Sequence, residues 1–271
     1  MSIELNASSR PPRPERASPH WRGRARAAGW HLLASLCVAS ALAFVLIALL
    51  YPTPFFHAAA GARLLVLMVL VDVVIGPCLT FVAFDARKPR AELRRDLGVI
   101  LALQVAALAF GLYSTALGRP VFMTFVVDRF ELVSAAEVDE AEQARAPAGL
   151  RTLSWSGPRL AAALPPTEPA ERERLLFAAA SGVDLKHLLS RYAPYESMRA
   201  DVIARLKPVA ALEALNDRSE VRKALARLGV AADATPDAIG WLPVAGKAED
   251  LVAFVDRRDA RLLGVARLEP W

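Results

Sequence analysis

The chain has little cysteine, histidine and patterned glycine, and these shortages exclude several kinds of site. Cys37 and Cys78 are the only cysteines, and both lie inside apolar runs, so the C-terminal half has no disulfide framework or thiolate site. After residue 120 the one histidine is His187, which excludes a metal site built on several histidines there. The sequence has no G-x-S-x-G, P-loop or dinucleotide-binding glycine pattern. We therefore expect a protein that is not an enzyme and binds no cofactor.

The two halves of the chain differ in charge. Residues 1–120 contain 13 Lys and Arg against 6 Asp and Glu, a net charge of +7, whereas residues 121–271 contain 20 against 22, a net charge of −2. A surface that binds nucleic acid needs basic side chains clustered on a folded face, and the C-terminal half has no such excess. The basic residues of the N-terminal half are better explained as a membrane-orientation signal, so we expect no nucleic-acid partner.

Three apolar runs in the N-terminal half are long enough to cross a membrane. With a helical rise of about 1.5 Å per residue, 21 or 22 residues cover a hydrocarbon core of about 30 Å. Trp30 and Tyr51 flank the first run, as interfacial aromatic residues do. The runs predict a three-helix transmembrane region over 29–118, with spans at about 30–51, 64–84 and 97–117.

The basic flanks predict how these spans are oriented. Six arginines precede the first span, and the segment DARKPRAELRRD between the second and third spans carries five more basic residues, whereas the connection before the second span has only Arg63. Basic flanks remain in the cytoplasm, so the N-terminus is expected inside and residues 119–271 in the periplasm of a bacterial inner membrane. The Arg- and Pro-rich residues 1–28 are expected to be a disordered cytoplasmic leader.

The C-terminal half is expected to be a soluble α+β domain that follows the membrane anchor. A β-branched and aromatic run, Val121 to Val127, predicts a strand; a Pro- and Ala-rich connector follows, to about Pro166. Helical patterns are predicted over 169–180, 183–192, 195–206 and 208–229, and strands return in the tail, where they are expected to join the first strands in one sheet. The three tryptophans of this half are expected in the core: Trp155, Trp241 and Trp271.

Asp72 lies in the middle of the second span. An acid there costs about 2.5–3.5 kcal/mol to insert, which the surrounding Leu, Ile, Val and Phe offset. Three explanations stay open: a structural hydrogen bond to Gln104 of the third span or Ser40 of the first, a contact with a partner's span, or proton transfer. In the first two, a protonated Asp72 would donate the hydrogen bond.

Gly76 and Pro77 predict a break in the same span. Proline lacks a backbone donor and clashes with the carbonyl four residues earlier, here Val73, which kinks a helix. The absence of a side chain at Gly76 lets another helix approach closely. Together with Asp72, these residues predict a kinked, polar notch in the bundle.

The loop after the second span is a further candidate site. Its charged residues could form a regulatory or nucleotide site, but such loops more often act as an orientation signal that contacts anionic membrane lipid. The candidate residues in and beside the loop are Asp85, Arg94, Arg95 and Asp96.

Several segments in this order resemble the TfpX/TfpZ family of type IV pilin accessory proteins. They are VDVVIGPCLTFVAFD, ARKPRAELRRDL, GRPVFMTFVVDRFELVSAAEVD, SWSGPRLAAALP, GVDLKHL and LVAFVDRRDARLLGVARLEPW. The likeness spans about residues 28–271. It assigns motif positions in the second span, in and beside the loop after it, and at the start of the C-terminal half. They are Asp72, Gly76, Pro77, Asp85, Arg94, Arg95, Asp96, Asp128, Arg129 and Phe130.

The resemblance implies an inner-membrane protein that helps a cognate type IV pilin to be assembled into pili. Pilin, and with it the assembly machinery, would be the partners, through transmembrane and periplasmic contacts, and the family implies no cofactor or catalytic residue. Two alternatives stay open: a membrane enzyme that modifies pilin, and a membrane sensor without a cytoplasmic output domain.

Overall fold

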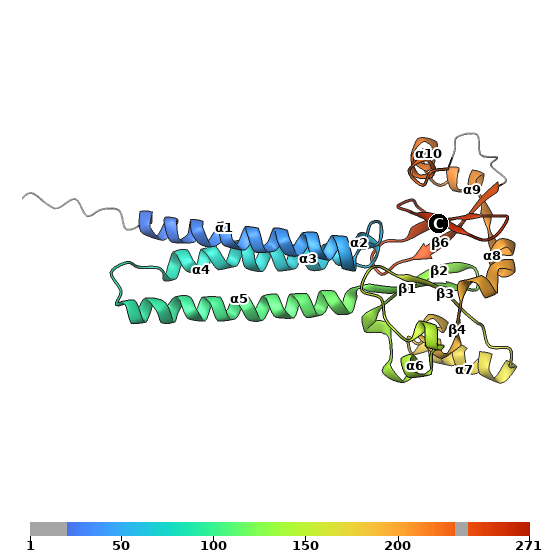
Figure 1. Cartoon of the computed structure of the whole chain (residues 1–271), viewed down its shortest axis with the longest axis horizontal. Helices are drawn as coiled ribbons and strands as arrows, with labels where there is room; N and C mark the ends of the chain where they lie inside the picture. Colours follow the sequence, from blue (N-terminus) through green and yellow to red (C-terminus); the bar gives the residue numbers. More distant parts are fainter. Residues whose placement is uncertain (1–20, 231–237) are drawn as a thin grey trace, which may run out of the picture.

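The computed structural model describes residues 21–230 and 238–271, which form a helical bundle joined end-on to a sheet domain (Figure 1). Of the leader expected over 1–28, residues 1–20 lie outside the described part. Residues 21–28 are helical, because α1 (Trp21–Val45) begins well before the apolar run. The segment between Trp21 and Trp30 is mostly arginine and alanine, both strong helix formers, so nothing in it ends the helix.

The bundle contains three helices long and apolar enough to cross a membrane, at Trp21–Leu50, Leu65–Ala83 and Arg90–Gly118. The first joins α1 to the π-helical turn η1 (Leu46–Leu50), and the third is α5 (Arg90–Gly118). The second joins α3 (Gly61–Val69), the π-helical turn η2 (Leu70–Ile75) and α4 (Gly76–Ala83). The third helix begins seven residues before its predicted span, since Pro89 precedes its first turn and the charged turns continue the helix beyond the apolar part.

The loop between the first and second spans docks onto the sheet domain. Tyr51 is fully buried and donates a hydrogen bond from its hydroxyl to the Thr115 carbonyl, 2.8 Å away. The helix α2 (Phe55–Ala58) follows, and the carbonyl of its last residue, Ala58, accepts hydrogen bonds from the backbone N–H groups of Lys247 and Ala248, both at 2.9 Å. Phe55 and Ala58 also pack in the domain core. The bundle and the domain are therefore held together by this loop as well as by the direct connection from α5 to the first strand.

The domain is built on one mixed sheet, in the order β4-β3-β1-β2-β6-β7-β8, with β5 paired to β6. Strands β1 and β3 run parallel, as do β2 and β6; the remaining pairs are antiparallel. The strands are β1 (Pro120–Val126), β2 (Arg129–Ser134), β3 (Arg159–Ala163), β4 (Tyr192–Ala193), β5 (Lys207–Pro208), β6 (Ile239–Ala245), β7 (Leu251–Asp256) and β8 (Leu262–Ala266). The first and last strands therefore join in one sheet, as the sequence predicts.

Short helices surround this sheet. Helices α6 and α7, near β4, lie on one side of the domain, and α9 and α10 lie on the other (Figure 1). The α-helices are α6 (Glu140–Arg145), α7 (Pro169–Ala180), α8 (Arg199–Arg205), α9 (Val209–Glu213) and α10 (Arg218–Arg227). The 3₁₀ turns are η3 (Ala135–Glu137), η4 (Ala148–Leu150), η5 (Leu185–His187), η6 (Leu189–Arg191) and η7 (Tyr195–Met198).

Three segments differ from the expected secondary structure. The helical pattern over 208–229 is divided into α9 and α10, because Asp217 caps the start of α10 by accepting a hydrogen bond from the Ser219 N–H at 2.6 Å. The Pro- and Ala-rich connector contains β3, whose alanines have little strand propensity; parallel pairing with β1 and burial of its last three residues override that preference. The helix expected over 183–192 is replaced by η5, η6 and β4. Asp184 accepts a hydrogen bond from Leu185 N–H at 2.6 Å, which favours a local turn over a longer helix.

Of the three tryptophans expected in the core, only Trp241 is buried. Trp155 is 61% exposed and Trp271 is 52% exposed, so the expectation is wrong for both. Each lies against a cation: the Arg119 guanidinium is 3.8 Å from the Trp155 ring centre, and Lys207 Nζ is 5.6 Å from that of Trp271. Cation–π contact stabilises an exposed ring without burying it.

Candidate functional site

A polar notch lies inside the bundle, where all three spans meet. It consists of His31 on α1, Asp72 in η2, Gly76 and Thr80 on α4, and Gln104 on α5. His31 Nδ1 and Thr80 Oγ1 are 2.5 Å apart, and Gln104 Nε2 donates to the Asp72 carbonyl at 3.5 Å. Polar side chains in a span are costly unless they face a bundle interior or a partner, which makes this notch the strongest candidate site.

The π-helical turn explains the position of Gln104. In η2 the Gly76 N–H donates to the Val71 carbonyl, five residues earlier, so the next donor position, residue 77, falls opposite the Asp72 carbonyl. Pro77 has no N–H, and that carbonyl would have no donor without Gln104. The sequence placed the freed carbonyl at Val73, four residues before the proline; the π register moves it by one residue.

Gly76 is required by how closely the other spans approach. A Cβ at this position would lie 2.0 Å from Gln104 Nε2 and 3.3 Å from His31 Nε2. The first and third spans thus both reach Gly76 with polar side chains. Small residues permit such approach between transmembrane helices, in agreement with the expectation drawn from the sequence.

The Asp72 side chain remains without a partner. Its Oδ1 is buried and has no hydrogen-bond partner among the described residues. Gln104 contacts its backbone rather than its carboxyl group, and Ser40 is exposed on α1. Neither of the two acceptors expected from the sequence therefore pairs with the carboxyl group in this structure.

A groove of about 190 Å³ opens beside Asp72, between the second and third spans. Its wall is almost entirely apolar, and Asp72 is its one ionisable residue; the others are Leu67, Met68, Val71, Ala107, Phe110, Gly111 and Ser114. The notch and the groove thus share Asp72. Their chemistry supports hydrogen bonding and helix packing within the membrane.

His31 and Thr80 belong to the notch but were not singled out in the sequence. A signal was available for His31, because ionisable residues are rare within membrane spans and suggest a polar contact. Thr80 gave no such signal, since threonine is common where transmembrane helices pack. Which turn of another helix each of them meets depends on the packing, so their pairing across 49 residues was not predictable.

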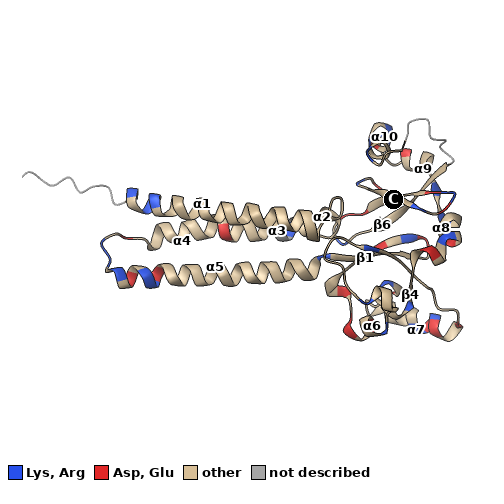
Figure 2. Ribbon diagram, in the orientation of Figure 1, with Lys and Arg blue, Asp and Glu red and all other residues tan. Residues whose placement is uncertain are grey.

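The candidate loop residues lie at the end of the bundle opposite the sheet domain, where Lys and Arg gather (Figure 2). Asp85 forms an ion pair with Arg24 at 3.5 Å, and Asp96 with Lys88 at 2.7 Å; Arg94 and Arg95 are exposed. The hydrogen bond that Asp85 accepts from the Arg87 N–H, together with nearby arginines, lowers the pKa of its carboxyl group. These contacts tie the loop to α1 and α5.

Asp128, Arg129 and Phe130 lie at the turn between β1 and β2. Arg129 Nε donates to Asp128 Oδ1 at 3.1 Å, while Phe130 is buried against Phe125 and Tyr195. The preceding residue, Val127, is exposed and has a φ of 57°, an unfavourable conformation for a β-branched side chain. The three predicted residues therefore divide between an exposed, strained turn and the core.

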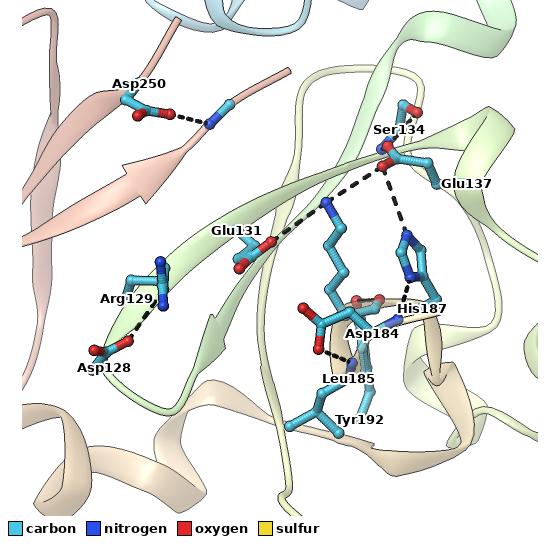
Figure 3. A network of polar contacts seen from close by, with 12 residues as sticks. Asp128, Arg129, Glu131, Ser134, Glu137, Asp184, Leu185, His187, Tyr192 and Asp250 are labelled. Carbon is cyan, nitrogen blue, oxygen red and sulfur yellow. Dashed lines mark hydrogen bonds and ion pairs between the residues drawn. The ribbon is translucent and has the colours of Figure 1, made fainter. Parts of the chain in front are cut away.

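A polar network that the sequence did not predict links β2 to η5 (Figure 3). Lys186 Nζ lies 3.4 Å from Glu131 and 3.5 Å from Glu137. Burial alone would raise the pKa of Glu137, but two hydrogen bonds from Ser134, at 2.8 and 2.6 Å, and the charges of Lys186 and Lys247 hold it below its ordinary value. In the described ranges, 21–230 and 238–271, no three metal-binding side chains come together.

Comparison with known proteins identifies the family. A family model described as fimbrial assembly protein FimB matches residues 19–60. The fimbrial assembly protein of serogroup I from Dichelobacter nodosus is 29% identical over 186 residues, 69% of this chain and 72% of the relative. That of serogroups C1 and C2 is 34% identical over 122 residues, 44% of this chain and 93% of the relative. The chain belongs to the fimbrial assembly protein family. No solved structure matches it.

In this fimbrial assembly protein the segment that the family model matches contains the first span and the docking loop. Of residues 19–60, those described run from α1 to α2, so they include His31 of the notch and Ala58 at the sheet. The matched segment therefore contacts both the bundle and the domain. The relatives are named for assembly rather than for an enzymatic reaction.

Proposed function

We propose that this fimbrial assembly protein is an inner-membrane accessory protein of the TfpX/TfpZ type, which assists assembly of a cognate type IV pilin without modifying it. The observation that carries the proposal is the union of bundle and domain by the loop over 51–60. A pilin before assembly has one apolar helix in the membrane and a head domain outside it. A bundle with a groove and a sheet domain joined to it can contact both parts at once.

The distribution of charge supports a periplasmic position for the sheet domain. The basic residues of α1 and of the loop after the second span meet at the far end of the bundle (Figure 2). Arg24 contacts Asp85 there, so both basic flanks lie on one side. Basic flanks remain cytoplasmic, which leaves the domain on the opposite face of the membrane with the pilin head.

The test is deletion of the gene, with complementation, in a strain whose pilin is known. We expect surface pili to be lost while pilin stays in the inner membrane, and the pilin to be recovered with the tagged chain after gentle detergent extraction. Unchanged piliation would overturn the proposal. Intact mass spectrometry of pilin from both strains tests the enzyme alternative, since a mass difference that depends on the chain would mean covalent modification.

A further inference from the structure

The groove between the second and third spans lies in the apolar part of the bundle. No side chain of the described residues fills it. Phe110 at its rim is 70% exposed, so the groove opens toward the surroundings of the bundle rather than into it. Asp72 is the eighth residue of the span Leu65–Ala83, about 10 Å along the helix from its first residue. The groove therefore lies at the depth of the hydrocarbon core.

The wall formed by the third span is built from small side chains. Ala107, Gly111 and Ser114 follow a spacing of four and then three residues, which places them on one face of α5. Met68 already packs on Gly111, where a Cβ would lie 2.6 Å from Met68 Cγ. The rest of this face offers the close backbone approach that transmembrane helices use when they associate.

The one ionisable residue of the groove calls for a hydrogen-bond donor. Asp72 lines the groove, and its Oδ1 is buried without a partner in the described residues, so the carboxyl group must turn toward the groove to meet a donor there. An unsatisfied polar group in hydrocarbon is costly, and an acyl chain has no donor to offer. A helix satisfies its own backbone and can carry one donor side chain or a protonated amine, so a helix fits both walls of the groove.

We propose that this groove seats the apolar transmembrane helix of a pilus subunit, with a hydrogen-bond donor of that helix on the Asp72 carboxyl group. The proposal rests on the function proposed above and names the surface that performs it. Binding there would hold the subunit's helix beside the second and third spans, with its head next to the sheet domain.

The first test places a photo-crosslinking amino acid at Phe110 in the full-length chain, in cells that express the subunit. Phe44 is the matched control, because it is a similarly exposed phenylalanine, at 74%, on the first span and outside the groove. We expect a crosslink to the subunit from position 110 and not from position 44. Crosslinks from 110 only to a second copy of the chain would overturn the proposal.

The second test changes Asp72 while position 110 carries the crosslinker. Asp72→Asn keeps an acceptor of the same size, so we expect the crosslink to be retained. Asp72→Leu removes the acceptor, and we expect about a threefold lower crosslink yield per molecule, the change that one intramembrane hydrogen bond supplies. If the crosslink yield per molecule is unchanged in Asp72→Leu, Asp72 does not contact the subunit. This conclusion holds whether or not the variant chain is less abundant.

Ala107→Leu keeps Asp72 but fills the groove from the third span, and it too is expected to reduce the crosslink. These results separate the two proposals. If deletion abolishes piliation but position 110 never crosslinks to the subunit, the groove assignment is wrong and the assembly function stands. If deletion leaves piliation intact, the assembly function itself is wrong.

Discussion

At the scale of single residues, the notch depends on Gly76, which has no side chain. In Gly76→Ala the new Cβ overlaps Gln104 Nε2, so Gln104 must give up its hydrogen bond to the Asp72 carbonyl. Pro77 has no N–H to replace that bond. We expect the variant to lose about 1 kcal/mol of stability in detergent, the scale of an intramembrane hydrogen bond, read as a lower thermal midpoint. The control is Gly98→Ala in the third helix, where nothing lies within 4 Å of the new Cβ. Equal midpoints for the two variants would contradict the role given to Gly76.

Asp256, the last residue of β7, makes the domain sensitive to acid. Hydrogen bonds from the Arg258 side chain and N–H lower its pKa from 3.8 to about 2. Because the folded pKa lies below the unfolded one, the stabilisation is complete above about pH 4 and is lost as the pH falls through the folded pKa. We expect Asp256→Asn to lower the thermal midpoint at pH 6 and to flatten its decline between pH 4 and pH 2.

Arg258→Gln provides the companion measurement. It removes the guanidinium and keeps the backbone donor, so the pKa of Asp256 should move back toward its ordinary value. The decline should then be smaller and should end at a higher pH, while its onset, which the unfolded pKa sets, stays the same. The Arg258 side chain is largely exposed, and its replacement leaves the core unchanged. An identical pH profile in Arg258→Gln and the unmodified chain would refute this account of the turn.

At the scale of elements, the contact between the docking loop and the domain can be isolated with two glycines. Gly157 has a φ of 84°, and a Cβ there would lie 2.7 Å from Pro52 Cγ, whereas Gly182 has a φ of 86° and nothing within 4 Å. Both alanine variants incur a left-handed backbone cost of about 1–2 kcal/mol, and only Gly157→Ala also displaces the loop. We expect Gly157→Ala to lower the thermal midpoint further and to speed protease cleavage within 51–60. Indistinguishable cleavage in the two variants would mean that Pro52 does not anchor the loop.

At the scale of the whole molecule, the ends of the bundle predict the topology. Ala60 precedes the second span at the domain end, and Lys88 lies at the far end with the basic cluster. Reporter fusions after Ala60 and after Gly157 are expected to report the periplasm, and a fusion after Lys88 the cytoplasm, because basic flanks are retained inside. A cytoplasmic report from the Gly157 fusion would reverse the orientation and remove the basis for contacts with a pilin head.

The sequence by itself determined the three spans, the clustering of basic residues and the strands at both ends of the domain, because these depend on composition and short-range periodicity. It also identified Asp72, Gly76 and Pro77, since an acid and a helix breaker are conspicuous in an apolar run. It did not determine β3, whose alanines become a strand only when β1 pairs with them.

Tertiary structure alone decided how the site is assembled. The π register of η2 moved the unpaired carbonyl from Val73 to Asp72, and packing brought Gln104 to it from 32 residues away. Helix packing likewise paired His31 with Thr80 and opened the groove beside Asp72. Such contacts depend on which faces of separate helices meet, and that follows from the fit of many side chains at once rather than from any local pattern.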